Sequence, residues 1–309
     1  MILYKYATFD IGLMVLRSSK IRFTQLASLN DAFESFPPVD RVYTDDEFWT
    51  IVGRTVDNPS KLQDLLLDFA DQLFDRLSLE QQKTFPKPVF SQYLLATMNS
   101  NLAKQGKSFS SLLKEIAAVE KDTVISAAKT ELVKQVANSV GVLSLTQTPD
   151  DEKMWSIYAQ ENQGIAIGFD SSSPFFKNAF PISYRRDRPR LNMNEIPSTE
   201  KEWNDSIRLV CGTKNETWAY EHEYRLALPI GVLEKTGKLD SRNNPIYVCD
   251  FPLDTVKEIV FGALTGRDQR ESIVEASSAL SSKVNFRFVR LDTKDYSIHL
   301  EPYDVKLPG

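Results

Sequence analysis

A long block of helical periodicity separates two β-rich stretches of this chain and limits the folds that it can adopt. Between residues 44 and 138, apolar side chains recur at steps of three and four residues, which places them on one face of a helix. The first run consists of Leu62, Leu65, Leu66, Phe69, Leu73, Phe74 and Leu77. A second helix is expected after Pro88, and a third from Ser108 to Asn138. We therefore predict a helical insertion or lobe over residues 44–140.

The sequence on either side of this block has the pattern of β-strands. Strands over residues 2–6 and 20–24 flank a helix over 10–18, and a turn follows at 28–31. Helices are also expected from residue 148 and over 198–211 and 268–280. Seven further strands are expected at 142–146, 165–169, 181–184, 224–228, 246–251, 256–261 and 284–289.

The order of these elements indicates the fold class. Because the later strands cluster instead of alternating strictly with helices, we predict an α+β fold with a mixed, mostly antiparallel sheet. The helical block then interrupts a single domain, residues 1–309. Its β-rich main part, 141–309, is expected to pack with the strands of 1–34.

Composition and charge exclude several classes of protein. Of the 309 residues, 42% are hydrophobic and 26% charged, as in ordinary globular proteins. The net charge of -5 argues against a protein whose whole surface grips nucleic acid, although it permits a local basic patch. The pattern lacks a leader segment and a membrane span, and two separated cysteines fit a reducing compartment, so a cytoplasmic protein is expected. With only two histidines and no paired thiols, no zinc site built from histidine and cysteine is expected, whereas magnesium bound by carboxylates stays open without a motif to mark it, so no metal ligand is assigned.

One loop concentrates positive charge. Four arginines, Arg185, Arg186, Arg188 and Arg190, lie within six positions around a proline. Guanidinium groups match phosphate oxygens bidentately, so this loop is a candidate contact for the phosphate of a nucleotide ligand or of RNA. The alternative is a solvated loop without a ligand.

Polar side chains also occur at regular positions on three expected strands. Lys5 projects from its strand on the side opposite Tyr4 and Tyr6, whereas Ser144 and Thr146 share one face of another strand. Glu221 and Glu223 share a face if the strand that contains them begins early. On neighbouring strands, a cation, two hydroxyls and two carboxylates would surround a small polar ligand. The alternative for each taken alone is a polar strand edge that faces water.

Seven short segments form an ordered pattern in the β-rich parts of the chain. They are LYKY (3–6), LNDAFE (29–34), LSLT (143–146), MWSIYA (154–159), GIAIGFD (164–170), YEHEYR (220–225) and IVFG (259–262). Together they resemble a bacterial family catalogued as domain of unknown function 2971. The resemblance covers most of the chain outside the helical block, but the family name assigns no function.

A more distant resemblance implies a chemistry. Lys5, Ser144-x-Thr146 and Glu221-x-Glu223 occur in the order of the basic, hydroxyl and acidic motifs of ADP-ribosyltransferases. This resemblance implies that NAD is cleaved and that ADP-ribose passes to a protein or nucleic-acid acceptor, as in toxins and phage-defence effectors. Glu223 would stabilise the oxocarbenium-like sugar, and Glu221 would position the acceptor. The cofactor site that it implies comprises Lys5, Tyr6, Ser144, Thr146, Tyr158 and Arg225.

Two other functions remain open. The chain is alternatively a binding module with a degenerate pocket, in which Lys5 pairs with the glutamates and Arg225 closes the site. It is alternatively a nucleic-acid-processing enzyme centred on residues 185–190. The environment of Glu223 discriminates between these functions, because a carboxylate paired away from any cleft would not serve catalysis. Trp155 and Trp218 are expected in the core.

Overall fold

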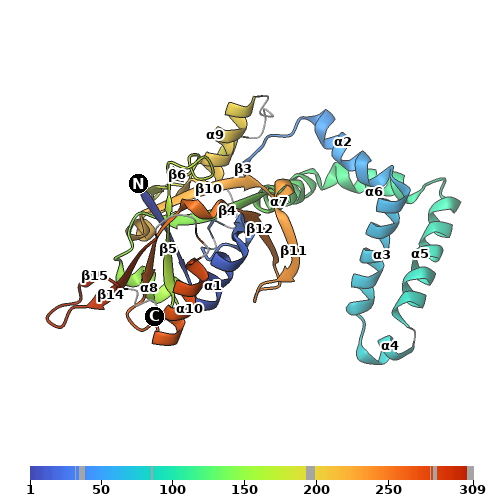
Figure 1. The fold of residues 1–309 in the computed structure, drawn as a ribbon. Coiled ribbons are helices and arrows are strands. Elements are labelled where there is room, and N and C mark those ends of the chain that lie inside the picture. Colours follow the sequence, from blue (N-terminus) through green and yellow to red (C-terminus); the bar gives the residue numbers. More distant parts are fainter. Residues whose placement is uncertain are drawn as a thin grey trace. The chain divides into compact units, whose positions relative to one another are not determined.

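The computed structural model describes residues 1–31, 33–34, 39–84, 86–192, 199–278, 280 and 284–304. Its internal contacts divide the chain into two compact units (Figure 1). We call residues 1–39 together with 133–309 the sheet unit, and residues 40–132 the helical unit.

Side-chain caps begin several helices of the helical unit. Thr44 caps the first of them by accepting a hydrogen bond from Glu47 N, while the Glu47 carboxylate accepts from Thr44 N. Asn58 caps the next helix by accepting a hydrogen bond from Lys61 N, and Pro59 occupies its first position. The helices are α2 (Asp45–Val56), α3 (Pro59–Asp75), α4 (Leu79–Thr84), α5 (Lys87–Lys104), α6 (Phe109–Val119) and α7 (Lys121–Ser139), the last of which continues into the sheet unit.

The single helix predicted from Ser108 to Asn138 is wrong, because the helix breaks at Glu120 between α6 and α7. Ala117 of α6 belongs to the same apolar cluster as Phe48 of α2, and Val124 of α7 packs against that cluster. In one straight helix, each residue would lie 1.5 Å further along the axis, so the side chains of α7 would move steadily away from this cluster. The break allows both helices to turn apolar residues toward one small core.

The sheet unit contains most of the strands and four α-helices. Its strands are β1 (Ile2–Ala7), β2 (Lys20–Gln25), β4 (Val140–Thr146), β5 (Ile165–Asp170), β6 (Phe180–Pro181), β7 (Ser183–Arg185), β8 (Leu191–Asn192), β9 (Thr213–Asn215), β10 (Glu223–Pro229), β11 (Glu234–Leu239), β12 (Pro245–Asp250), β13 (Val256–Phe261), β14 (Asn285–Leu291) and β15 (Ile298–Pro302), and β3 (Val39–Asp40) lies at the unit boundary. Its α-helices are α1 (Phe9–Ser18), α8 (Glu152–Tyr158), α9 (Glu200–Cys211) and α10 (Arg267–Ser277). Short 3₁₀ helices are η1 (Leu26–Ser28), η2 (Glu216–Glu221), η3 (Ile230–Val232) and η4 (Leu253–Thr255). Ser198, predicted to begin a helix, lies outside the described residues, and Thr199 caps α9.

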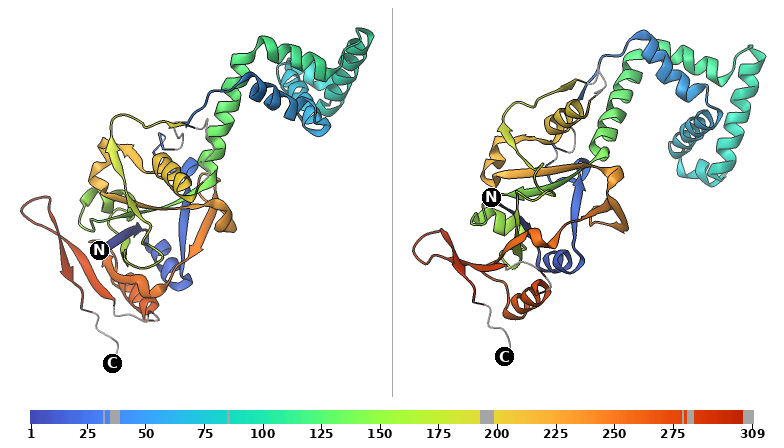
Figure 2. Two further views of the ribbon diagram at one scale, coloured as in Figure 1. Left: turned by 90° about the horizontal axis from the view of Figure 1, so that it is seen from above. Right: turned by 45° about the horizontal axis from the view of Figure 1, so that its top comes forward.

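Most strands of this unit join one sheet, in the order β11-β12-β2-β4-β1-β5-β13-β14-β15, with β10 on β4 and β6 on β10. Within this sheet β13 and β14 pair in parallel, and the other described pairs are antiparallel. The β14–β15 hairpin forms its edge, drawn in red in Figure 2. The predicted α+β class with a mixed, mostly antiparallel sheet is confirmed.

The centre of the sheet is covered on both faces. Ile165 and Ile167 of β5 belong to one apolar cluster with Leu16 of α1 and Ile273 of α10. Ala166 belongs to a second cluster that contains Trp155 of α8 and the rings of Tyr4 and Tyr6. Because successive strand residues point to opposite faces, β5 contributes to both clusters and is buried along nearly its whole length. Strand β1 pairs with β5 along its whole length, so β1 is fixed at the buried centre of the sheet.

Candidate functional site

Strand β4 has two different neighbours along one edge. Near its start Val142 pairs with Thr24 of β2, and at its end Thr146 pairs with Tyr4 of β1. The described pairings of this edge join residues 143–145 to neither strand, whereas the other edge pairs with β10 throughout. Lys5 Nζ reaches this gap and donates a hydrogen bond to the Ser144 carbonyl oxygen at 3.1 Å. The sheet therefore forks at the middle of β4.

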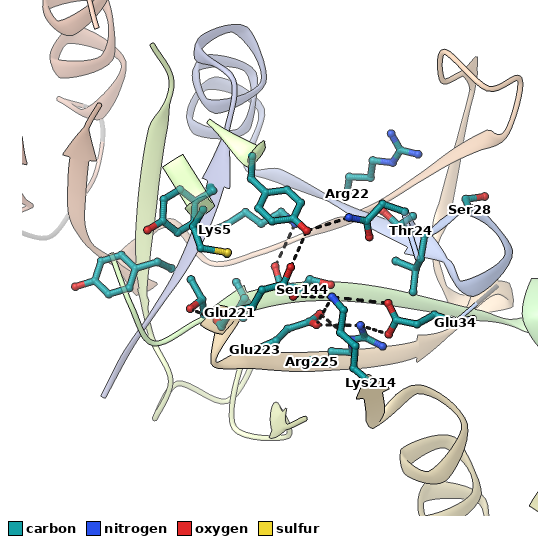
Figure 3. Close-up of a pocket in the computed structure, with 18 of the residues that line it drawn as sticks. Lys5, Arg22, Thr24, Ser28, Glu34, Ser144, Lys214, Glu221, Glu223 and Arg225 are labelled. Carbon is teal, nitrogen blue, oxygen red and sulfur yellow. Dashed lines mark hydrogen bonds and ion pairs between the residues drawn. The ribbon is translucent and has the colours of Figure 1, made fainter. Parts of the chain in front are cut away.

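A cavity of about 300 Å³ lies at the fork, and we call it the strand pocket (Figure 3). Residues of β1, β2, β4 and β10 line it, together with segments around residues 30, 158, 214 and 240. Its volume is at the lower end of the range of small-molecule sites. Both carboxylates of the predicted acidic pair, Glu221 and Glu223, are among its lining residues.

A local backbone turn explains how two carboxylates separated by one residue line the same cavity. Turn η2 ends at Glu221, and β10 begins at Glu223. Between them, exposed His222 has a left-handed backbone conformation with φ 42° and ψ 47°. Thr146 Oγ1 fixes one side of this turn by donating to the Glu221 carbonyl oxygen at 2.6 Å. Tyr184 Oη fixes the other side by accepting from Glu223 N at 2.8 Å.

The buried side of the pocket, which we call the inner wall, is a network of ion pairs among Glu34, Lys214, Glu221, Glu223 and Arg225. Arg225 donates from Nε to Glu223 Oε1 at 2.7 Å and from a terminal nitrogen to Glu223 Oε2 at 2.9 Å. It also pairs with Glu34 and donates to the Cys211 carbonyl oxygen. Lys214 Nζ lies 2.5 Å from Glu221 Oε2, 3.3 Å from Glu223 Oε2 and 3.8 Å from Glu34 Oε2. All five side chains are at most 5% exposed.

The two cations do not act equally on the carboxylates. Burial acts to raise the pKa of Glu223, but Arg225 and Lys214 outweigh it and hold this pKa at about 2. Burial raises the pKa of Glu34 above its usual value, and in this case the same two cations only reduce the increase. Burial also opposes the charge of Lys214, yet Glu223, Glu34 and Glu221 together raise its pKa. Glu223 is therefore the firmly ionised carboxylate of the inner wall.

Lys5 lies in a different electrostatic position. Its side chain is half-buried, and burial lowers the pKa of its ammonium group to about 8, against an opposing effect of Glu223. The three carboxylates of the inner wall face only two cations of that wall, so a protonated Lys5 beside them balances the charge of the inner wall. Loss of its proton leaves one excess negative charge there.

A short chain of hydrogen bonds holds Glu221 from the side of helix α8. Tyr158 Oη donates to Glu221 Oε1 at 2.7 Å, and Asn30 Nδ2 donates to Tyr158 Oη at 2.9 Å. With Lys214 on the other carboxylate oxygen, both oxygens of Glu221 have donors. The orientation of Glu221 is thus determined by α8, β9 and the segment that follows η1.

The solvent side of the pocket, which we call the outer wall, consists of Arg22, Asp240 and Arg242. Arg22 pairs with Asp240 at 2.7 Å, and its side chain remains 36% exposed. Hydrogen bonds from Asn244 N and then from Arg22 lower the pKa of Asp240 to about 2. Arg242 donates to the Leu29 carbonyl oxygen at 3.4 Å, a weak contact. The guanidinium groups of the outer wall are therefore accessible from the solvent side of the pocket.

The structure brings most of the predicted site residues to one cavity. Lys5, Ser144, Thr146, Tyr158, Glu221, Glu223 and Arg225 all line the strand pocket. Tyr6 also lines it, but its hydroxyl donates to the Thr148 carbonyl oxygen and its ring packs edge-on against Trp155 at 4.9 Å. Arg225 and Tyr6 thus act mainly on neighbouring protein groups.

The prediction that Trp155 lies in the core is confirmed, since this side chain is fully buried. Trp218 is only partly buried, and the Lys214 ammonium lies 4.7 Å from its ring centroid. Its indole ring therefore covers the cation of the inner wall instead of filling an apolar core.

Sequence reasoning missed several residues of the pocket. Glu34 and Asn30 fall within the quoted segment 29–34, which was the available signal for them. Lys214, Arg22 and Asp240 had no such signal, because their partners are distant in sequence. The predicted arginine loop does not line the strand pocket: Arg185, Arg186 and Arg188 line a second cavity, and Arg190 lines neither.

Comparison with known proteins identifies one related family. The family model described as a protein of unknown function (DUF2971) matches residues 154–226. The matched segment runs from α8 to the start of β10 and contains Tyr158, Lys214, Glu221, Glu223 and Arg225 of the strand pocket. Comparisons with curated proteins and with solved structures give no match. The match supports the resemblance to this family over the segment that forms much of the inner wall.

Two kinds of feature are absent from the described part of the chain. There, no helix combines the length and apolar character needed to cross a membrane. The same residues contain no group of three or more histidine, cysteine, aspartate or glutamate side chains that could hold a metal ion.

Proposed function

We propose that the strand pocket binds NAD and that the protein transfers ADP-ribose from it to a nucleophilic acceptor. One observation carries this proposal: Lys5 of β1, Ser144 and Thr146 of β4, and the Glu221–Glu223 pair line a single cavity. Register brings β1 and β10 to the two sides of Thr146, which lies opposite both Tyr4 and Glu223. When the acceptor is a cellular protein or nucleic acid, such chemistry suits a toxin or phage-defence effector.

The lining fits the two chemical parts of NAD. A diphosphate requires cations, which Lys5, Arg22 and Arg242 supply. Ribose hydroxyls are good donors to carboxylates, which Glu221 and Glu223 supply. A cavity of about 150 Å³ accommodates benzene. The 300 Å³ of the strand pocket therefore suits one ring with its ribose, with the remainder of the ligand at the outer wall.

The proposed reaction breaks the bond between ribose C1′ and the nicotinamide nitrogen. Nicotinamide leaves with the electron pair of this bond, and the acceptor forms a new bond to C1′ as it loses a proton. The developing positive charge on the sugar is stabilised by a fixed negative charge nearby. Glu223, whose pKa is about 2, supplies a carboxylate that stays ionised throughout the physiological pH range.

One specific observation favours a second function, a binding module that holds the ligand without cleaving it. Both oxygens of Glu223 already accept hydrogen bonds from Arg225, at 2.7 and 2.9 Å. A carboxylate engaged in this way can shape a pocket without contacting a reacting atom. The transferase function requires that Glu223 also acts on the sugar through its charge or its remaining lone pairs.

The two functions differ in what happens to NAD. We would measure thermal stability with millimolar NAD and detect released nicotinamide by mass spectrometry, for wild type, Glu223→Gln and Glu34→Gln. Glu34→Gln is a matched control, because it removes a carboxylate from the same Arg225 and Lys214 network. Ligand at about one hundred times its Kd stabilises the fold by about 2.7 kcal/mol.

The transferase predicts that NAD stabilises all three proteins. It also predicts that wild type and Glu34→Gln release nicotinamide and that Glu223→Gln does not. Stabilisation without release from wild type would instead identify the binding module. Neither stabilisation nor release would overturn both proposals.

A further inference from the structure

A second cavity, of about 180 Å³, lies beside the arginine loop, and we call it the arginine cavity. Arg185, Arg186 and Arg188 line it together with Phe33, Leu209 and Val210. Its charge and its apolar side chains thus come from different segments of the chain. The strand pocket and the arginine cavity share Glu34 and Lys214 in their linings.

The position of the arginines is set by a short parallel strand pair. Strands β7 and β9 place Arg185 opposite Asn215, one residue after the pair of Tyr184 and Lys214. Arg185 is exposed, and Arg186 is 84% exposed although its Nε pairs with Glu216 at 2.6 Å. Arg185 and Arg186 therefore directly follow the strand residue that pairs with Lys214 of the inner wall.

The aromatic part of the cavity is equally accessible. Phe33 is 65% exposed even though the Arg188 guanidinium lies 5.7 Å from its ring centroid. An exposed aromatic ring next to arginines is the combination that binds single-stranded nucleic acids, through base stacking and phosphate contacts. Because 150 Å³ accommodates benzene, 180 Å³ with walls of Leu209 and Val210 accommodates a single base.

Negative charge limits how far this surface can extend. Asp31 and Asp187 also line the cavity, and the whole chain carries a net charge of -5. Such a balance disfavours binding along a long duplex and is compatible with one or a few nucleotides. Carboxylates can also accept hydrogen bonds from the amino groups of bases.

We infer that the arginine cavity binds a nucleotide unit of a single-stranded nucleic acid, with its phosphate at Arg185 and Arg186 and its base against Phe33. Lys214 lines this cavity and also contacts Glu221 and Glu223. The bound strand therefore lies next to the proposed transfer site and is its acceptor, a role that rests on the proposed function. A phosphorylated peptide would use the arginines but would leave Phe33 without a role.

Fluorescence anisotropy with labelled single-stranded DNA and RNA of about ten nucleotides tests the binding. The variants are Arg185→Ala/Arg186→Ala and Phe33→Ala. Arg267→Ala is a matched control for Arg186, because Arg267 is 82% exposed and likewise pairs with a glutamate, Glu271. Loss of base stacking predicts about 5- to 150-fold weaker binding by Phe33→Ala. The double variant is expected to bind at least about ten-fold more weakly and with a smaller dependence on salt, whereas the control is unchanged.

Several results would overturn this inference. They are no binding of either oligonucleotide by wild type, equal binding by wild type and the variants, or preferential binding of a phosphotyrosine peptide that depends on Arg185 but not on Phe33. The acceptor role is read separately, as an ADP-ribose mass increase of the oligonucleotide in the presence of NAD. Nicotinamide release without that increase would overturn the acceptor role alone, whereas oligonucleotide binding without release would leave this site standing and overturn the transferase.

Discussion

The two walls of the strand pocket differ in how their charged side chains are buried and paired. In the inner wall, Glu223 and Arg225 are almost fully buried and bonded to each other. In the outer wall, Arg22 keeps more than a third of its side chain exposed and has one carboxylate partner. Buried ion pairs rarely add net stability, but removing one partner is costly, and exposed pairs contribute little. The inner wall therefore fixes the shape of the pocket, whereas the outer wall leaves cations accessible to a ligand.

The largest effect is expected from breaking the inner wall. Arg225→Met leaves the buried carboxylates of Glu34 and Glu223 without one of the two cations that they share, so only Lys214 remains near both. We expect the free energy of unfolding to fall by about 3–5 kcal/mol, as measured by urea denaturation near neutral pH. Arg267→Met, at an exposed pair, is the control. A loss below about 1 kcal/mol would show that the network is not needed to hold the fold.

Lys5 lies between the walls, and its removal should stabilise the protein. The pKa of Lys5 is about 8 in the folded protein, lowered by burial from 10.5. Below that pH both states are protonated, and the folded state alone bears the cost of the buried charge. Between the two pKa values only the unfolded chain binds the proton, so wild-type stability rises with pH. Lys5→Met should therefore be more stable near neutral pH by about 2 kcal/mol, a value discounted for the partial exposure of Lys5.

Urea denaturation over a pH series measures this difference, which should shrink as the pH rises from about 8 toward about 10.5. Lys294→Met, at an exposed lysine, provides the control. A difference that is independent of pH would contradict the assignment of this titration to Lys5.

A smaller effect is expected where α8 supports the inner wall. Tyr158→Phe removes the hydroxyl that donates to Glu221 and accepts from Asn30. Loss of a hydrogen bond to a charged group should lower the free energy of unfolding by about 1.5 kcal/mol in the same denaturation assay. Tyr220→Phe is the control, because the Tyr220 hydroxyl makes no hydrogen bond to any other described residue. Equal stability of the two variants would remove Tyr158 from the network.

The smallest effect on stability is expected at the outer wall. Arg22→Met breaks one partly exposed pair with Asp240, so the free energy of unfolding should fall by less than about 1 kcal/mol. The same variant should weaken NAD binding in a titration, because it removes a cation from the ligand side. If Arg22→Met were as destabilising as Arg225→Met, the distinction between the walls would be wrong.

Local patterns were sufficient for much of the fold. Strand-forming apolar runs located β1, β5 and β13. Apolar periodicity located the helical block, but it did not predict the separate beginnings of α2 and α3. Strand β11 was missed because its EKTGKL sequence is mostly exposed and has no apolar alternation. The strand predicted at 181–184 is divided into β6 and β7, which pair with different partners, β10 and β9. Only tertiary pairing decides such a division.

The site shows the same limit. Sequence spacing indicated that Lys5, Ser144 and Glu223 would project from strands, and the structure gathers them at the fork of β4. It could not indicate that Lys214 of β9 and Glu34 would enter between them, because ion pairing across distant segments has no periodic signature. Sequence spacing also could not indicate that Arg225 would donate its hydrogen bonds to protein groups instead of a ligand.

The position of β1 has a consequence for synthesis on the ribosome. This strand ends at Ala7, but its partners β4 and β5 begin at Val140 and Ile165. At about 5–20 residues per second, translation between β1 and β4 takes about 7 to 27 s. The helical unit, whose contacts are local, emerges and can fold within that interval, as low contact order favours. Meanwhile the apolar segment ILYKYA has no sheet partner, so apolar surface of the kind that favours aggregation stays exposed on the nascent chain until β4 and β5 are made.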